Sequence, residues 1–178
     1  IIPQKQPILK KNFLAFMKSC GIIDPGDTMD RGNIEKIAHT PEDRLLLAED
    51  NVLHGRCETE NVEKDTYGPK GFRDPAHLLQ WLKDHRPPMD PVLSHGDFCL
   101  PNVFFKDGQV SGYLDLGFCA VADRYQDIAL CWRSLMHNAD GTYGPVYPGI
   151  DPDALFRSLG ITPDREKLRY YILLDELF

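Results

Sequence analysis

Apolar side chains recur at helical spacing along most of the chain. Ile128, Trp132 and Leu135, for example, lie four and three residues apart and therefore share one face of a helix. The same period, with the turn residues that bound it, predicts helices over residues 8–20, 40–53, 74–86, 123–137, 151–160 and 162–178. We therefore expect a mainly helical protein.

Residues with clear preferences for helix ends mark several of these boundaries. Thr40 followed by Pro41 fits a helix start, because a hydroxyl can cap the first amides and proline needs no partner there. Asp74 followed by Pro75 has the same form. Gly160 is expected to end the short helix that precedes the last one.

One segment departs from the helical pattern and predicts a β-hairpin. Residues 103–106 and 109–114 are short, largely apolar runs. Asp107-Gly108 lies between them, and this dipeptide tolerates the positive φ angles of a type I′ turn. A two-residue turn places Lys106 opposite Gln109.

The hairpin register brings polar side chains together. Counting back along both strands places Asn102 opposite Tyr113, so that Asp115 is a diagonal neighbour of Asn102, roughly 7–8 Å away between α-carbons. An amide and a carboxylate oxygen at that separation can reach one hard cation. Asp97 lies just upstream, where it can stand beside such an ion without ligating it.

These elements indicate one α+β domain over residues 1–178, because strands and helices do not alternate in βαβ order. We divide it into a helical part with an acidic loop (1–90), the hairpin region (91–117) and a helical part with an acidic C-terminus (118–178).

Composition and charge narrow the possible partners. The chain has 20 Lys and Arg against 27 Asp and Glu, a net charge of −7, which argues against nucleic acid and is compatible with a cationic ligand. No apolar run is long enough to span a bilayer and no signal peptide is visible, so we expect a cytoplasmic protein without a membrane partner. The five cysteines are scattered, without a C-x-x-C pair, and are expected to be free thiols.

Two acidic stretches need an explanation. Residues 58–65 have almost nothing to bury, and their spacing alone favours a solvated loop over a ligand site. Asp175 and Glu176 lie at the end of the last predicted helix, where carboxylates oppose the helix dipole at a cost of a few tenths to about 1 kcal/mol each. A bound polyamine would explain them, and chance placement is the alternative.

The polar residues of the hairpin region have the order required for phosphoryl transfer. His95-Gly-Asp97 is followed by Asn102 five residues after the aspartate, and by Asp115-Leu-Gly117 eighteen residues after it. Such a transfer needs a carboxylate to accept the proton of the attacking hydroxyl, and oxygens that hold Mg²⁺ on the β- and γ-phosphates. The pattern H-x-D-x-x-x-x-N with D-x-G is that of the catalytic loop and metal-binding turn of protein kinases.

With these motifs the chain resembles the aminoglycoside phosphotransferases, of the type that acts on the 3′-hydroxyl of kanamycin and neomycin. The resemblance is dense over residues 91–178 and looser over 40–90. It rests on Leu93–Asp97, Asn102–Phe104, Lys106–Gly108, Ser111–Gly117, Ala122–Ala129, Arg133-Ser134 and Tyr170–Phe178.

The resemblance implies a role for each motif residue. Asp97 corresponds to the catalytic base, and Asn102 and Asp115 correspond to the magnesium ligands. His95 and Asp127 correspond to residues that support the catalytic loop. An ATP or GTP co-substrate and Mg²⁺ are implied with them.

The same resemblance assigns the acidic stretches to the antibiotic. Arg133 is expected near the transferred phosphate, with an ion pair to a helix acid as the alternative. The residues that match drug-contacting positions are Glu60, Asn61, Glu63, Asp175, Glu176 and Phe178.

Two departures from the family pattern change the expectation. Phe118 follows Asp-x-Gly where similar enzymes often have arginine. The chain also has no Gly-rich phosphate loop and no strand lysine of the V-A-I-K type, and Gly68–Gly71 fits neither pattern. We therefore expect the mainly helical C-terminal lobe of the protein-kinase-like fold without its N-terminal β lobe, and we expect this fragment to be inactive by itself.

Two other functions fit the same residues. The chain can belong to a kinase-like enzyme for another small hydroxylated substrate, such as choline, homoserine or a sugar. It can also be a binding lobe that has lost catalysis. A failure to transfer phosphate to any aminoglycoside would favour the first alternative. Drug binding without nucleotide binding would favour the second.

Overall fold

The computed structural model describes residues 41–107, 109–142 and 144–178. The predicted helix over residues 8–20 and the predicted cap Thr40 lie outside these residues. The other helical predictions are confirmed, with small differences in their ends. The helices are α3 (Pro41–Leu53), α4 (Pro75–Asp84), α5 (Arg124–Asp140), α6 (Ala154–Leu159) and α7 (Arg165–Asp175).

Two small antiparallel sheets complete the α+β arrangement. β1 (Pro91–Ser94) pairs with β4 (Ala120–Asp123), and β2 (Val103–Lys106) pairs with β3 (Gln109–Tyr113). Single 3₁₀ turns precede β2 at Leu100–Asn102 and precede β4 at Leu116–Phe118. β4 was not predicted from the sequence, because two alanines and one valine give only a weak strand signal.

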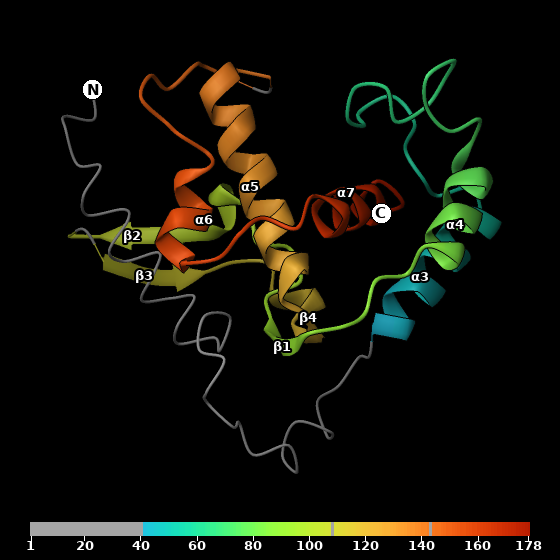
Figure 1. Ribbon diagram of the computed structural model, residues 1–178, viewed down its shortest axis with the longest axis horizontal. Coiled ribbons are helices and arrows are strands. Elements are labelled where there is room, and N and C mark those ends of the chain that lie inside the picture. Colours follow the sequence, from blue (N-terminus) through green and yellow to red (C-terminus); the bar gives the residue numbers. More distant parts are fainter. Residues whose placement is uncertain (1–40, 108, 143) are drawn as a thin grey trace, which may run out of the picture.

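Helix α5 lies at the centre of the molecule. It packs against α7 and β1, while α4 packs against both α3 and α7. In Figure 1 the hairpin β2–β3 lies on one side of α5 and the α3–α4 pair lies on the other, with α7 between α5 and that pair. Ile128, Ala129 and Leu130 of α5 are completely buried, as expected for the helix around which the core forms.

Aspartate side chains cap the starts of α4, α5 and α7. Asp74 accepts a 2.8 Å hydrogen bond from the amide of His77, as its position before Pro75 predicts. Asp123 caps α5 through the amide of Tyr125 and also accepts a 2.6 Å bond from Lys167 Nζ. The fully buried Asp123 carboxylate therefore ties the start of α5 to α7.

Helix α7 begins later than its Thr162-Pro163 signal predicts. Asp164 is the N-cap, and its carboxylate accepts bonds from the amides of Glu166 and Lys167. An aspartate that can reach two amides is a better cap than a threonine followed by proline, which explains the shift.

The hairpin confirms one part of the predicted register and contradicts another. Lys106 pairs with Gln109, and Asp107 has a positive φ of 50°. A bulge follows, because Phe105 pairs with Val110 but Phe104 pairs with Gly112. The extra residue in β3 shifts everything beyond it by one position.

The predicted pair of Asn102 and Tyr113 is therefore wrong. Tyr113 pairs with Val103, and the amide of Leu114 donates a 3.0 Å bond to the carbonyl of Asn102. Asn102 itself lies in a 3₁₀ turn rather than in the strand. Asp115 is consequently the residue directly after the one bonded to Asn102, and the diagonal geometry expected from an unbroken hairpin does not apply.

None of the helices in the described part of the chain is both long enough and apolar enough to cross a membrane.

Candidate active site

The loop that follows β1 is held by a buried carboxylate of α5. Asp127 accepts hydrogen bonds from the amides of His95 at 2.7 Å and of Gly96 at 2.9 Å. Burial raises the pKa of Asp127, and these two amide bonds oppose the rise. The carboxylate thus fixes the backbone immediately before Asp97, the residue expected to be the base.

Gly96 is required where the two halves of the site meet. Its φ is 88°, a conformation that side chains disfavour. A Cβ atom at this position would lie 2.3 Å from the carbonyl oxygen of Phe118. The loop after β1 and the turn before β4 therefore touch through their backbones.

Asn102 binds the expected base directly. Its Nδ2 donates to the Asp97 carbonyl at 3.0 Å and to Asp97 Oδ2 at 2.9 Å. Asn102 is buried, whereas Asp97 is half-buried. One carboxylate oxygen of Asp97 is therefore oriented by Asn102, and the second makes no hydrogen bond to the described residues.

Asp115 lies beside Asn102 on an exposed turn. It has a left-handed conformation with φ 54° and ψ 50°, which aspartate tolerates better than most residues. The bond from Leu114 to the Asn102 carbonyl keeps the turn next to Asn102. An amide oxygen and a carboxylate suit Mg²⁺, which usually takes one or two carboxylates and completes its shell with water and phosphate. Among the described residues, no group of three or more His, Cys, Asp or Glu has an arrangement that could hold a metal ion.

His95 is buried behind the loop. Its Nδ1 accepts a 3.3 Å bond from the Asp97 amide, and its ring makes edge contacts with Phe98 and Tyr113. These contacts pack the buried His95 ring against its neighbours, and its supporting role stays a prediction.

Arg133 on α5 is surrounded by carboxylates. Its guanidinium lies 2.5 Å from Asp175 Oδ2, 3.2 Å from Glu176 Oε1 and 3.9 Å from Glu63 Oε1. Burial alone would lower the pKa of Arg133, but attraction to these acids outweighs burial and raises it. The structure thus contains the ion pair that was the alternative to a phosphate contact for Arg133.

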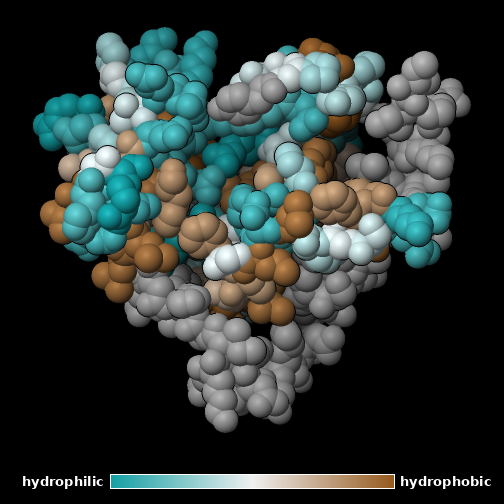
Figure 2. All heavy atoms as spheres, turned by 180° about the vertical axis from the view of Figure 1, so that it is seen from behind, coloured by the Kyte–Doolittle hydropathy of each residue, from teal (hydrophilic) through white to brown (hydrophobic). Residues whose placement is uncertain are grey.

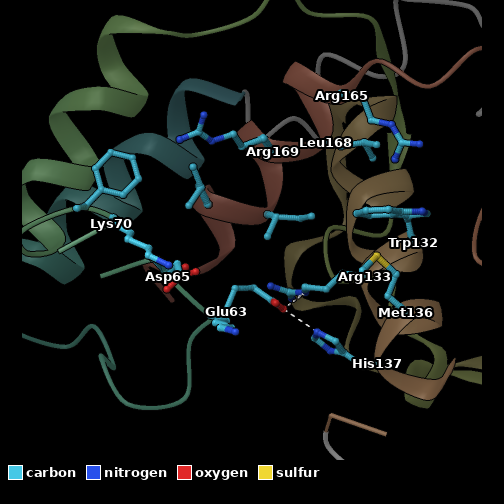
Figure 3. Close-up of a pocket in the computed structure, with 16 residues that line it drawn as sticks. Glu63, Asp65, Lys70, Trp132, Arg133, Met136, His137, Arg165, Leu168 and Arg169 are labelled. Atoms are coloured by element: carbon cyan, nitrogen blue, oxygen red, sulfur yellow. Dashed lines mark ion pairs between the residues drawn. The ribbon is translucent and has the colours of Figure 1, made fainter. Parts of the chain in front are cut away.

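The acidic loop and the C-terminus form one network through these contacts. Glu63 also forms an ion pair with His137, with 2.8 Å to Nε2 (Figure 3). The amide of Glu63 donates a 3.2 Å bond to Glu176 Oε2. Burial raises the pKa of Glu176 to about 7, against the attraction of Arg133. Asp175 and Glu176 therefore have cationic partners inside the molecule, which accounts for carboxylates at a helix C-terminus.

Arg44 was missed in the sequence, and it connects the two ends of the site. This nearly buried guanidinium donates to the Gly96 carbonyl at 2.7 Å and to Asp175 Oδ1 at 2.8 Å. It also stacks on the rings of Phe118 and Phe178, 5.0 and 4.5 Å from their centroids. Burial lowers the pKa of Arg44, with Asp175 as the strongest opposing charge. An arginine inside an amphipathic helix gave no sign of these distant partners.

The remaining residues expected at a substrate site are spread over the same surface. Phe178 packs edge-on against Phe118, with centroids 5.6 Å apart. Glu60 is exposed, and the exposed Asn61 donates a 3.1 Å bond to Glu58. The structure thus joins Glu63, Asp175, Glu176 and Phe178 through Arg44 and Arg133, while Glu60 and Asn61 extend from the loop.

Comparison with known sequences identifies relatives of this chain. A profile of the family described as "Phosphotransferase enzyme family" matches residues 13–170. An aminoglycoside 3′-phosphotransferase of Enterococcus faecalis is 45% identical over 120 residues, which cover 67% of this chain and 41% of that protein. One from Escherichia coli is 40% identical over 139 residues, 76% of this chain and 46% of that protein. The matches span less than half the length of these curated relatives.

Solved structures show the same fold. A type VIII aminoglycoside 3′-phosphotransferase superposes with a TM-score of 0.76 at 28% identity, covering 99% of this chain and 63% of that chain. An aminoglycoside phosphotransferase from Streptomyces rimosus, solved with ADP and streptomycin, superposes with a TM-score of 0.68 at 22% identity, covering 98% and 64%. The resemblance read from the motifs is confirmed: the chain belongs to the phosphotransferase enzyme family.

Proposed function

We propose that this chain is the catalytic and substrate-binding lobe of an enzyme that transfers the γ-phosphate of ATP or GTP to the 3′-hydroxyl of a kanamycin- or neomycin-type aminoglycoside. The transfer inactivates the antibiotic and gives resistance. The observation that carries the proposal is the pairing of Asp97 with Asn102, next to the turn that presents Asp115.

Asp97 is placed to act as the base. Asn102 Nδ2 occupies its Oδ2, which leaves Oδ1 to accept the proton of an attacking hydroxyl. Asp127 and Arg44 hold the preceding backbone, so the carboxylate is oriented before the substrate arrives. A substrate hydroxyl that binds next to this oriented carboxylate can give up its proton to Asp97 as the phosphate is transferred.

The oxygens of Asn102 and Asp115 are the groups that would hold Mg²⁺. Bound there, the ion would neutralise the charge of the β- and γ-phosphates. Two protein ligands suffice, because phosphate and water oxygens supply the remainder of an octahedral shell.

The acidic residues supply the attraction for a polycation. Glu60 and Asn61 on the loop, with Asp175 and Glu176 at the C-terminus, carry the groups that ammonium substituents prefer. Arg133 and Arg44 compensate part of this charge in the absence of a drug. A drug ammonium therefore has to compete with, or add to, existing ion pairs, which favours a ligand with several charges.

The other half of the nucleotide cleft is proposed to lie in a further lobe. The matches to curated relatives cover only 41–46% of their length. Large apolar side chains are exposed beside the metal-binding turn, with Leu114 and Leu116 each 52% exposed and Phe118 43% exposed. A surface of this kind suits contact with a nucleotide base or another lobe, so this chain alone is expected to show little or no turnover.

Two measurements test the proposal. Calorimetry of the chain with kanamycin should detect binding that weakens as salt increases, since the contacts are ionic. Phosphorylation of an aminoglycoside panel should be assayed with a protein that also contains the nucleotide-binding half. Transfer to none of the panel would favour a kinase for another hydroxylated substrate, and drug binding without nucleotide binding in that longer protein would favour a binding lobe.

A further inference from the structure

A cavity lies between the loop before α4, the C-terminal half of α5 and α7. Its volume is 370 Å³, within the usual range for small-molecule sites. Seen from behind, the surface is hollowed between the parts formed by this loop and by α5, and hydrophilic side chains line the hollow (Figure 2). Its apolar wall consists of Phe72, Trp132, Met136, Leu168, Ile172 and Leu173.

Basic side chains dominate the charge around this cavity. Lys64 and Lys70 come from the loop, and Arg165 and Arg169 come from α7. Figure 3 labels Lys70 and the two arginines. Neither lysine has a carboxylate partner among the described residues. This concentration of positive charge is unexpected in a chain whose net charge is −7.

The carboxylates of the cavity do not cancel this charge. Glu63 is turned toward Arg133 and His137 and forms ion pairs with both (Figure 3). Asp65, on the loop, is exposed to solvent. Arg165 lies 3.6 Å from Asp153 but also faces the ring of Trp132, with 5.4 Å to the centroid.

The cavity is distinct from the proposed catalytic centre. Its lining includes Glu63 and Arg133, but not Asp97, Asn102 or Asp115. The three C-terminal residues expected to contact the drug are also absent from its wall. Its charge is opposite in sign to that of the acidic surface, so a polycationic drug is a poor match for it.

We propose that this cavity binds a small organic anion with a flat apolar body, such as an aromatic carboxylate. The ring system would lie against Trp132, Leu168 and Ile172, where it removes apolar surface from water. The carboxylate would point toward Lys64 and Lys70, whose ammonium groups can accept a new partner without breaking an ion pair among the described residues. This binding is independent of phosphate transfer.

Fluorescence titration tests the proposal. Replacing Trp81 by phenylalanine leaves Trp132 as the single tryptophan, since the chain has two. Added 2-naphthoate should change the emission of Trp132 with saturation, and calorimetry on the unmodified chain should give the same dissociation constant. Neutral 2-naphthamide should bind at least about 3-fold more weakly, because it lacks the charge.

Lysine variants test whether Lys64 and Lys70 bind the carboxylate of 2-naphthoate. The double substitution Lys64→Gln and Lys70→Gln should weaken 2-naphthoate binding about 3- to 10-fold, as expected for two partly exposed ion pairs. Lys106→Gln on the hairpin removes one positive charge away from the cavity and is the matched control, with no change expected.

Three outcomes would overturn the proposal. They are no saturable binding of 2-naphthoate at millimolar concentration, equal binding of the amide, and equal binding by the lysine double variant. Displacement of 2-naphthoate by kanamycin would also overturn it, because the cavity would then be part of the drug site. If the chain binds 2-naphthoate but does not bind kanamycin, that result would count against the proposed function and leave this inference standing.

Discussion

The loop after β1 and the turn before β4 form opposite sides of one site, and the chain holds them very differently. His95, Gly96 and Asn102 are buried, and the loop backbone is bonded to Asp127 and Arg44. Residues 114–118 are all exposed. The position of Asp97, the proposed base, is thus determined within this chain, whereas the turn with the proposed metal ligand Asp115 faces outward.

This difference separates what the chain can do alone from what it needs a partner to do. A buried, hydrogen-bonded loop keeps its geometry without ligands. An exposed turn with large apolar side chains gains order when nucleotide, ion or a further lobe covers it. We therefore expect mutations on the first side to act on stability and mutations on the second to act mainly on ligand binding.

The largest effect on stability is expected from the substitution of Arg44, which links the two sides. Arg44→Ala should lower the free energy of unfolding by about 3–5 kcal/mol, because it removes one of the two cations beside the largely buried Asp175 carboxylate and leaves the Gly96 carbonyl with only the longer 3.4 Å bond from Gln126. Urea unfolding measures this change. Arg56→Ala, which removes an exposed pair with Asp50, is the control and should cost less than about 1 kcal/mol. Equal losses in the two variants would contradict the connecting role of Arg44.

Removal of the base should affect turnover more than folding. In a protein that includes the nucleotide-binding half, Asp97→Ala should reduce turnover by at least ~10²-fold, the usual cost of losing a general base. Steady-state phosphorylation of kanamycin measures it. Asp107→Ala is the control, because it removes an exposed carboxylate at the turn of the hairpin that has no role in the proposed reaction. Activity of the Asp97 variant within twofold of the parent would sink the assignment.

Substitution of Asp115 should affect ligand binding but not stability, because this residue is exposed and is proposed to bind an ion. Asp115→Asn should leave urea unfolding almost unchanged but raise the Mg²⁺ concentration for half-maximal activity by about 10-fold, since even partners outside the ligand shell contribute that much. A metal titration of the same longer protein measures it, and an unchanged titration curve would count against the ligand role.

The buried carboxyl of Glu176, at the C-terminal end of α7, should make stability depend on pH. The pKa of Glu176 is raised to about 7 from its ordinary value of 4.5, so its stabilising contribution is present below pH 4.5 and is lost as pH rises through 7. Glu176→Gln should remove this component, and the stability of the parent relative to the variant should fall between pH 5 and pH 8. Glu60→Gln, on the exposed loop, is the control. Parallel pH profiles for the parent and the Glu176 variant would disagree with the burial of this carboxyl.

The smallest effect is expected where the turn is most exposed. Leu116→Ser should change the free energy of unfolding by less than about 0.5 kcal/mol, because this side chain is 52% exposed. Leu130→Ala on α5 is the matched comparison and should cost about 2–5 kcal/mol, since Leu130 is completely buried. A cost above 1 kcal/mol for Leu116→Ser would show that the turn is covered within the chain itself.

Local signals in the sequence were sufficient for most elements. The Asp74 cap, the apolar face of α5 and the Lys106–Gln109 pair follow from residues within a few positions of one another. The end of α6 before Gly160, whose φ is 68°, follows in the same way. Short-range preferences are enough when the determining contacts are also short-range.

Features that depend on distant contacts were not predictable in this way. The bulge in β3 breaks the alternation on which the predicted register of Asn102 was based, and its local sign is Gly112, a residue type that can mark a bulge inside a strand but does not require one. The partners of Arg44 lie 52 and 131 residues away in the chain. The ion pairs of Arg133 with the C-terminal acids could be named only as an alternative, because a sequence does not show which charges meet.

The contact between Gly96 and Phe118 has a consequence for how this site can change in evolution. Every single-base change in a glycine codon that alters the amino acid introduces a residue with a Cβ atom, and here that atom would collide with the Phe118 carbonyl. A substitution at Gly96 therefore requires a prior rearrangement of the turn before β4. If Glu60 and Asn61 contact the substrate as proposed, variation in substrate range is more accessible through them, because their exposed side chains can be exchanged one at a time.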